Sequence, residues 1–491
     1  MYLGLDFGTS FSQPATIFLD NPKLLLEHAE YGIPSAFYYD REYEILVGQE
    51  ALDAGQGNQA KNLVREVKMD IIDGKQFYLD GRNFSTKDIV KEIYKSLISK
   101  AIQVAKKEAN INTNIEGVVI SVPAKFGMQE CYLLKEAVEN CWDTKIPVMA
   151  IIKEPVAAAL AYYNTGLEDD KHILVYDLGG GTCDVALVRS DSSAAEHYTV
   201  IDSDMVRIGG RLWDEKLASY ITQDIEKKAG INFRDLDEET RCGYEEKIRR
   251  EAIKAKHALS DPDKEKTMIR VELNGRIYTT SVTKSLFDEL TISLLLQTFE
   301  CLENVYSRNS NVSIDEIICV GGSSNMRQVR ERLSEHFPGC EIKIFEPELA
   351  VVNGAAIYAN MPRQSALIDR VSFSYGTDSF IKYTDNQIVS NIIKQGDEFP
   401  ITREKHYSPR HDNQETVCFN IYESEIVEEE YPFSEPNKRF IGNVTLKLPP
   451  HSPNTLDLTC QLKLSNNGIL EVEATEPSGH RIEATFDIKS L

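Results

Sequence analysis

Residues 173–191 read ILVYDLGGGTCDVALVRSD. An apolar run closes with Asp177, three glycines and a threonine follow, and Asp184 opens a second apolar run. This arrangement predicts two strands joined by a tight turn, since glycine readily adopts the positive φ that such turns need. Taken alone, the stretch fits a plain hairpin as well as a phosphate-binding turn, because short glycine motifs are common.

The composition narrows the class of protein. A chain of 491 residues with a hydrophobic share of 42% is long enough for roughly three folding units. Its net charge of -23 opposes a nucleic-acid backbone, which is bound by cations. The nine cysteines are scattered without a CxxC pair, which favours reduced thiols over disulfides or a zinc site. No run reaches the length of a membrane span and no signal peptide is evident. We therefore expect a cytoplasmic protein without nucleic-acid or membrane partners.

Short strands alternate with amphipathic helices up to about Met361. The strands are expected at 117–123, 173–177 and 316–320, and this alternation predicts an α/β domain over 1–361. Ser85 and Asp88 form a partial capping signal that predicts the start of a helix. Apolar residues then follow at four-residue spacing from Ile89. The charge-dense stretch 234–266 predicts a mostly solvated helix that ends at Asp261-Pro262.

The pattern changes after Met361. Residues 362–370 lack a strong pattern and are expected to form a linker, and 371–491 then alternate with period two. Leu456, Leu458, Cys460, Leu462 and Leu464 share one face, a turn follows at Gly468, and the alternation resumes from Leu470. This pattern predicts an antiparallel β unit, a sandwich. Such a unit can be a stabilising appendage or can hold an extended peptide.

The opening motif has a counterpart near the start of the chain. Residues 2–18, YLGLDFGTSFSQPATIF, again give a strand, an aspartate (Asp6), a glycine-containing turn and a second strand. Two such hairpins suggest an internally duplicated fold. A strand on both sides of each turn excludes a Walker loop, which opens a helix and carries GK[ST].

Two facing turns of this kind can hold a polyphosphate between them. Glycine bares backbone N–H groups to anionic oxygens, and Thr9, Ser10 and Thr182 add hydroxyl donors. Asp6 and Asp177 would repel phosphate unless a cation lay between them. Mg²⁺ uses few carboxylates and keeps much of its water, so this pair predicts Mg²⁺.

Two further glycine pairs lie in RIGGRLWDEKLASYI (207–221) and CVGGSSNMRQVRERLSEHF (319–337), each leading into a helix. Individually each pair is explained by a packing turn. Because a helix amino terminus favours an anionic or polar ligand, the pairs could also enclose a nucleoside.

Taken together, these residues resemble the seventy-kilodalton heat-shock chaperones of the DnaK type, within the actin-like ATPase superfamily. The matching strings are LGLDFGTSFS, VISVPAKF, IIKEPVAAALAY, LVYDLGGGTCDVALV, VGGSSNM, NGAAIYA, DNQETVCFNIYE, LPP and NNGILEVEA. The resemblance covers nearly the whole chain. It implies a duplicated actin-like (ribonuclease-H-like) ATPase domain in two lobes over 1–361, followed by a β-sandwich that binds peptide over 371–491.

The resemblance also implies site residues, position by position. The catalytic set is Lys68, Glu154, Asp177 and Thr182, in which Lys68 places the attacking water and meets the γ-phosphate. Asp6 and Asp177 hold hydrated Mg²⁺. ATP or ADP is bound by Gly8, Thr9, Ser10, Phe11, Gly179, Gly180, Gly181, Thr182, Gly209, Gly210, Lys256, Ser260, Gly321, Gly322, Ser323 and Asn325. The peptide pocket is formed by Thr377, Phe380, Tyr407 and Val417.

The chain departs from the family at several positions. Ile253 replaces an acid that binds ribose, and Asn325 replaces an arginine that stacks on adenine. No segment of these 491 residues corresponds to the helical lid, which leaves either fast peptide exchange or a lid beyond the given sequence.

The preferred interpretation is an ATP-hydrolysing chaperone whose partners are extended polypeptides and possible co-chaperones or nucleotide-exchange factors. A regulatory scaffold that binds nucleotide with little turnover is one alternative. A small-molecule kinase of the same superfamily is the other.

Overall fold

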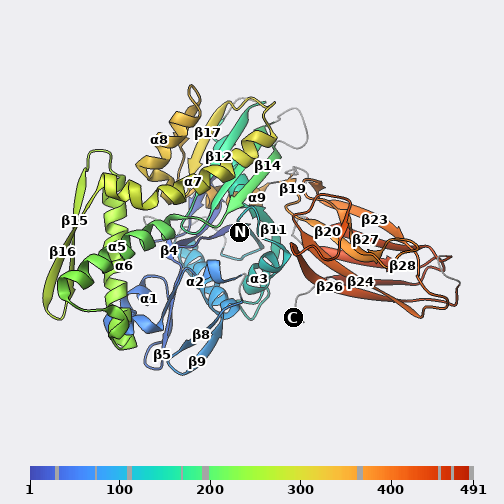
Figure 1. Cartoon of the computed structure of the whole chain (residues 1–491), viewed down its shortest axis with the longest axis horizontal. Helices are drawn as coiled ribbons and strands as arrows, with labels where there is room; N and C mark the ends of the chain where they lie inside the picture. Colours follow the sequence, from blue (N-terminus) through green and yellow to red (C-terminus); the bar gives the residue numbers. More distant parts are fainter. Residues whose placement is uncertain are drawn as a thin grey trace. The chain divides into compact units, whose positions relative to one another are not determined.

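The computed structural model describes residues 1–27, 32–71, 74–107, 113–166, 170–190, 198–361, 369–451, 455–465 and 469–485. The chain separates into two compact units (Figure 1). The first comprises Met1–Ala124, Ala137–Ser192 and Ser203–Arg363, and the second comprises Lys125–Glu136, Ser193–Asp202 and Gln364–Leu491. Most of the expected linker, 362–368, and the turn expected at Gly468 lie outside the described residues.

The first unit contains two sheets with the same strand arrangement. One has the order β11(Val148–Lys153), β10(Gly117–Val122), β1(Tyr2–Phe7), β2(Phe11–Phe18) and β3(Asn21–Leu24). The other has the order β18(Glu341–Ile344), β17(Glu316–Val320), β12(His172–Leu178), β13(Cys183–Ser190) and β14(Tyr198–Val206). In each sheet the first strand of a hairpin, β1 or β12, pairs antiparallel with its successor and parallel with a later strand. Both glycine-containing hairpins expected from the sequence are therefore present.

Amphipathic helices supply the rest of the core. The predicted capping signal is confirmed at α2(Thr86–Lys107), where the backbone N–H of Ser85 donates to the Asp88 carboxylate at 2.9 Å and the Asp88 N–H donates to the Ser85 hydroxyl at 3.2 Å. The stripe that begins at Ile89 is buried. Helices α4(Glu154–Tyr163) and α9(Ala350–Asn360) pack closely, and a Cβ on Gly354 would collide with the backbone of Ala157.

The glycine pairs at 209–210 and 321–322 precede helical turns, as expected. Helix α5(Gly210–Ala229) begins within the first pair. The second pair leads into a 3-10 turn over Gly322–Asn325, and α8(Arg327–His336) follows. The charge-dense segment forms α6(Glu238–Ser260), which ends immediately before Asp261-Pro262 as predicted.

The first unit contains further helices and strands besides these. They are β4(Ile33–Pro34), β5(Ala36–Asp40), β6(Glu44–Val47), α1(Gln49–Ala54), η1(Gly57–Asn62), β7(Leu63–Arg65), η2(Val67–Asp70), β8(Gln76–Leu79), β9(Arg82–Ser85), β15(Lys266–Leu273), β16(Arg276–Thr283) and α7(Lys284–Arg308). Helix α3(Met128–Glu139) begins in the second unit's segment Lys125–Glu136. No helix in the described part of the chain is long and apolar enough to cross a membrane.

The β strands expected after Met361 form two sheets around one core. The five-stranded sheet has the order β25(Glu430–Pro432), β21(Gln387–Ile393), β20(Ser374–Phe380), β24(Thr416–Ser424) and β26(Lys438–Lys447). The four-stranded sheet has the order β23(Ile401–Tyr407), β27(Leu458–Leu464), β28(Leu470–Thr475) and β29(Arg481–Thr485). The predicted apolar face is confirmed, because Leu458, Cys460, Leu462 and Leu464 are buried and Leu456 packs against the same cluster. A further pair, β19(Asp369–Arg370) with β22(Glu398–Phe399), begins within the stretch expected as a linker.

Candidate active site

The two glycine-containing hairpin turns lie against each other. A Cβ built on Gly180 would lie 2.5 Å from the Ser10 hydroxyl oxygen, and one built on Gly181 would lie 2.5 Å from the Thr9 hydroxyl oxygen. Any side chain at these glycines would therefore separate the turns. Thr9 and Thr182 are both buried at this contact.

The glycine pair at 209–210 packs against the β12–β13 turn. A Cβ on Gly209 would lie 2.5 Å from backbone atoms of Gly180 and Gly181, so α5 begins directly against the β12–β13 turn. The N–H groups of Gly210 and Arg211 donate to the carbonyls of Gly179 and Gly180 at 3.0 and 2.8 Å. These bonds occupy two of the N–H groups that a helix start leaves free for an anion.

The glycine pair at 321–322 follows β17 and lies against the end of β12. Gly321 has a φ of 77°, and a Cβ there would lie 2.5 Å from the Asp177 carboxylate. The N–H of Leu178 donates to the Ser324 hydroxyl at 3.3 Å. All four glycine turns therefore meet around the end of β12.

A buried charged cluster lies beside these turns. Lys68 of η2 is only 3% exposed, and its ammonium lies 2.5 Å from the Glu154 carboxylate at the start of α4. Asp6 accepts a hydrogen bond from the Ser121 hydroxyl at 2.6 Å. Asp184, the first acid of β13, accepts one from the Ala124 N–H at 2.6 Å. Asp177 is buried on β12 and interacts electrostatically with these groups.

The cluster has more negative than positive charge. Burial raises the pKa of Glu154 to about 8 and that of Asp184 to about 6, and it raises the pKa of Asp6 and, strongly, of Asp177. Burial also opposes the charge on Lys68, but Glu154 and Asp6 outweigh it and raise the pKa of this lysine. One ammonium thus serves four carboxyl groups, of which Glu154, Asp177 and Asp184 are buried and Asp6 is partly buried. A bound cation would stabilise this arrangement.

The residues present fit Mg²⁺ bound with few protein ligands. Asp177 is buried and Asp6 is partly buried, the charge of both carboxylates is incompletely balanced, and oxygen ligands of this kind suit Mg²⁺. Within the described ranges, no group of three or more His, Cys, Asp or Glu side chains is assembled as a metal cage. Water and phosphate oxygens would therefore have to complete the coordination.

The shift of Glu154 predicts how stability depends on pH. Its pKa is about 8 in the folded chain against an ordinary value of 4.5, so near pH 7 the folded state holds a proton that the unfolded state has released. The free energy of unfolding should then fall as the pH rises towards 8, by up to about 1.4 kcal/mol per pH unit. Urea denaturation at several pH values measures this slope. The slope should become shallower in Glu154→Gln, which lacks the carboxyl group at position 154, while Asp177, Asp184 and Asp6 keep their own contributions.

The matched control for that measurement is Glu245→Gln. Glu245 is exposed on α6 and pairs only loosely, at 3.9 Å, with Arg241 of the same helix. It should keep the wild-type slope. Equal slopes in wild type and Glu154→Gln would show that Glu154 is not the titrating group.

Of the residues predicted to contact the nucleoside, Lys256 lies at the start of α5, whereas Ser260 and Asn325 form hydrogen bonds within their own helix or turn. Lys256 is buried and donates to the Asp214 carboxylate at 2.9 Å and to the Gly210 carbonyl at 3.2 Å, which brings it to the start of α5. Ser260 donates to the Lys256 carbonyl at 2.9 Å within its own helix. Asn325 is exposed and donates to the Gly322 carbonyl at 3.2 Å.

The remaining predicted residues lie at or near the hairpin turns. Phe11 begins β2 and its side chain is 44% exposed. The Gly8 carbonyl accepts a hydrogen bond from the Ser35 hydroxyl at 2.7 Å. A Cβ on Gly210 would crowd the Ser323 hydroxyl, so Ser323 faces the start of α5.

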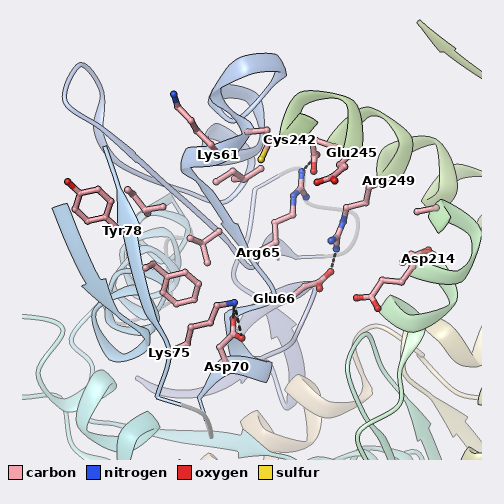
Figure 2. Close-up of a pocket in the computed structure, with 18 of the residues that line it drawn as sticks. Lys61, Arg65, Glu66, Asp70, Lys75, Tyr78, Asp214, Cys242, Glu245 and Arg249 are labelled. Atoms are coloured by element: carbon pink, nitrogen blue, oxygen red, sulfur yellow. Dashed lines mark hydrogen bonds and ion pairs between the residues drawn. The ribbon is translucent and has the colours of Figure 1, made fainter. Parts of the chain in front are cut away.

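A cavity of about 630 Å³ lies between β7, β8 and helices α5 and α6. Figure 2 shows residues that line it. Two ion pairs cross it, Arg65 with Glu246 and Arg249 with Glu66. Asp214, the partner of Lys256, also lines it. The residues of the charged cluster, Lys68, Glu154, Asp6, Asp177 and Asp184, do not line this cavity. The cavity is therefore a neighbour of the candidate site and not part of it. The crossing pairs were not anticipated, because residues about 180 positions apart give no sequence signal of contact.

Asp184 is the functional candidate that sequence reasoning missed. Its signal was present, because it is the second aspartate of the stretch 173–191 and stands within an apolar run. A charged residue at a buried strand position requires compensation, and its raised pKa and its bond to Ala124 place it in the cluster.

The predicted peptide-site residues gather on the β-sandwich. Phe380, Tyr407 and Val417 line a second cavity of about 770 Å³. Thr377 is fully buried on β20, next to the lining residue Asp378.

The α/β unit with its converging glycine turns and the β-sandwich have the architecture that the resemblance to the ATP-dependent heat-shock chaperones implies. A family model described as Hsp70 protein matches residues 2–490. The chain therefore belongs to the Hsp70 family, and the resemblance stated above is confirmed.

Named relatives agree with this membership. A ribosome-associated molecular chaperone of Eremothecium gossypii is 28% identical over 522 residues, which cover 97% of this chain and 80% of that protein. Ribosome-associated molecular chaperones of Nakaseomyces delphensis and Saccharomyces cerevisiae are also 28% identical, with the same coverage.

Proposed function

We propose that this chain binds Mg²⁺·ATP at the converging glycine turns, hydrolyses it, and couples its nucleotide state to the binding of extended polypeptide. The observation that carries the proposal is the contact of two hairpin turns beside a buried Lys68–Glu154 pair. Lysine side chains are rarely buried unless they are paired with an acid. A buried lysine beside a candidate phosphate site is therefore a candidate functional residue.

In the proposed reaction, each residue has a separate task. The Lys68 ammonium offsets charge on the γ-phosphate and orients the attacking water, and Glu154 holds Lys68 in place. Thr182 and the N–H groups bared at Gly180 and Gly181 bind phosphate oxygens. Asp6 and Asp177 would hold Mg²⁺, which neutralises phosphate charge when bound. Water attacks in line, and ADP and phosphate are the products.

The shared strand arrangement of the two large sheets supports a duplicated, two-lobed ATPase domain. We propose its boundaries as 1–361, with 362–370 as linker and 371–491 as the peptide-binding domain. The nine cysteines, all within the described ranges, form no disulfide, which suits a reducing compartment such as the cytoplasm. Co-chaperones or exchange factors would act on this cycle.

Coupling requires that nucleotide and peptide each distinguish the same two states of the protein. Single-turnover ATP hydrolysis should therefore accelerate when an extended peptide is added. The rate is measured by phosphate release with and without peptide, and without any other acceptor. Release that peptide does not alter would contradict coupling.

Phosphate release also distinguishes the proposed function from a regulatory scaffold and from a small-molecule kinase. A regulatory scaffold is favoured by Ile253 and by Asn325, whose side chain bonds its own turn. That scaffold predicts nucleotide binding without phosphate release. A small-molecule kinase predicts no release of free phosphate, because it would transfer the phosphoryl group of ATP to an added hydroxyl acceptor and leave ADP.

A further inference from the structure

The cavity on the β-sandwich has polar groups beneath its rim. Its lining comes from the end of β20, the segment that joins β20 to β21, β21 itself, the end of β23, the segment that joins β23 to β24, β24, and Glu430 of β25. Phe380 lies at this cavity under the Arg410 guanidinium, whose central carbon is 4.3 Å from the ring centre. Arg410 is also paired with Asp385, so its charge is already compensated.

Three hydroxyl groups lie at this cavity or directly behind it: two belong to lining residues, and the third, that of Thr377, belongs to a fully buried neighbour of the lining. Thr377 of β20 and Ser390 of β21 are direct cross-strand partners, with exposures of 0% and 1%. Ser390 and Tyr407 line the cavity. In the part of the chain that the structure describes, the hydroxyl oxygens of all three residues are buried without a hydrogen-bond partner.

The Tyr407 phenol illustrates how close these groups are. Burial raises the pKa of Tyr407, and the nearby Ser390 hydroxyl opposes that rise. Both residues line the same cavity, and among the described residues neither hydroxyl has a hydrogen-bond partner of normal geometry.

Unpaired buried hydroxyls are costly in a folded protein. Each one has given up its hydrogen bond to water without gaining a partner within the protein. Most buried polar groups find a partner, so three together at one cavity require an explanation. A ligand that supplies the missing partners would recover part of this free energy, whereas an aliphatic side chain would leave all three unpaired.

We propose that this cavity selects an extended peptide through a carboxamide side chain, asparagine or glutamine, which bonds the hydroxyls of Thr377, Ser390 and Tyr407. This inference rests on the proposed peptide-binding function of the β-sandwich. A carboxamide offers two N–H donors and an oxygen with two acceptor sites, and hydroxyls can serve as partners to both. It is also neutral, so its burial avoids the cost of desolvating a charge.

The test compares two fluorescent peptides that differ only in a central asparagine or leucine, which are close in size and shape. Anisotropy titrations use the full chain with ADP. The asparagine peptide should bind at least about 10-fold more tightly, the discrimination expected of a site that hydrogen-bonds its ligand. Equal binding, or tighter binding of leucine, aspartate or lysine peptides, overturns the selectivity while leaving peptide binding intact. If no peptide binds, the proposed function and this inference both fail.

Isosteric variants locate the effect. Thr377→Val and Tyr407→Phe remove one hydroxyl each with little change of shape, and both should shrink the asparagine preference. Thr402→Val is the matched control, because Thr402 is exposed on β23 and does not line the cavity. An unchanged preference in both cavity variants contradicts the proposal.

Thermal denaturation supplies a second readout. Thr377→Val should melt no lower than wild type, since it removes an unsatisfied buried hydroxyl. A lower melting temperature would show that this hydroxyl already has a stabilising partner within the chain, which also overturns the proposal.

Discussion

Replacing Lys68 with alanine is expected to slow single-turnover ATP hydrolysis at least about 100-fold, equivalent to about 3 kcal/mol of transition-state stabilisation. Lys68 is buried, and it is the cation that its neighbours Glu154, Asp6 and Asp184 share. Its loss removes the positive charge that offsets the γ-phosphate, and it leaves Glu154 unpaired. Quenched-flow measurement of phosphate release gives the rate, and nucleotide affinity is measured separately by fluorescence titration.

Two further variants make this result interpretable. Lys75→Ala removes a lysine that is half exposed and pairs at 3.3 Å with Asp70, and it should hydrolyse ATP as wild type does. Lys68→Met keeps most of the side-chain length without its charge and should be as slow as Lys68→Ala. Wild-type rates in either Lys68 variant would remove this residue from the reaction.

Replacing Gly209 with alanine is expected to weaken nucleotide binding by at least about 30-fold, or about 2 kcal/mol. The new methyl group would lie 2.5 Å from the backbone of Gly180 and Gly181, and backbone atoms cannot move aside as a flexible side chain can. The β12–β13 turn must therefore separate from the start of α5. Isothermal titration with Mg²⁺·ADP measures the affinity.

Gly230 provides the matched control at the other end of the same helix. It ends α5 with a φ of 68°, and a Cβ there would meet nothing within 4 Å. Gly230→Ala should lower stability by about 1 kcal/mol through backbone strain and leave nucleotide affinity unchanged. If Gly209→Ala binds nucleotide as tightly as Gly230→Ala does, the contact between the turns does not shape the site.

Much of the fold could be predicted because its signals are local. The hairpins around Asp6 and Asp177, the capping signal at Ser85 and the alternation from Leu456 to Leu464 each follow from periodicity or turn chemistry over a few residues. The structure has all of them. The β19 strand was not expected, because two residues are too few to show a period.

The candidate site was only partly predictable. The motif residues were found, but their contacts depend on chain segments far apart in the sequence, such as Gly180 against Ser10. The Lys68–Glu154 contact joins residues 86 positions apart, and nothing local to Lys68 indicates that it is buried. The three unpaired hydroxyls at Thr377, Ser390 and Tyr407 became visible only once β20, β21 and β23 were placed.

The most direct test of the account is a crystal structure with Mg²⁺ and a non-hydrolysable ATP analogue. The account predicts that the phosphates lie between the Gly8–Ser10 and Gly179–Thr182 turns, with Mg²⁺ near Asp6 and Asp177 and Lys68 facing the terminal phosphate. Nucleotide bound instead in the cavity lined by Arg65 and Arg249, or phosphates that contact neither turn, would contradict it.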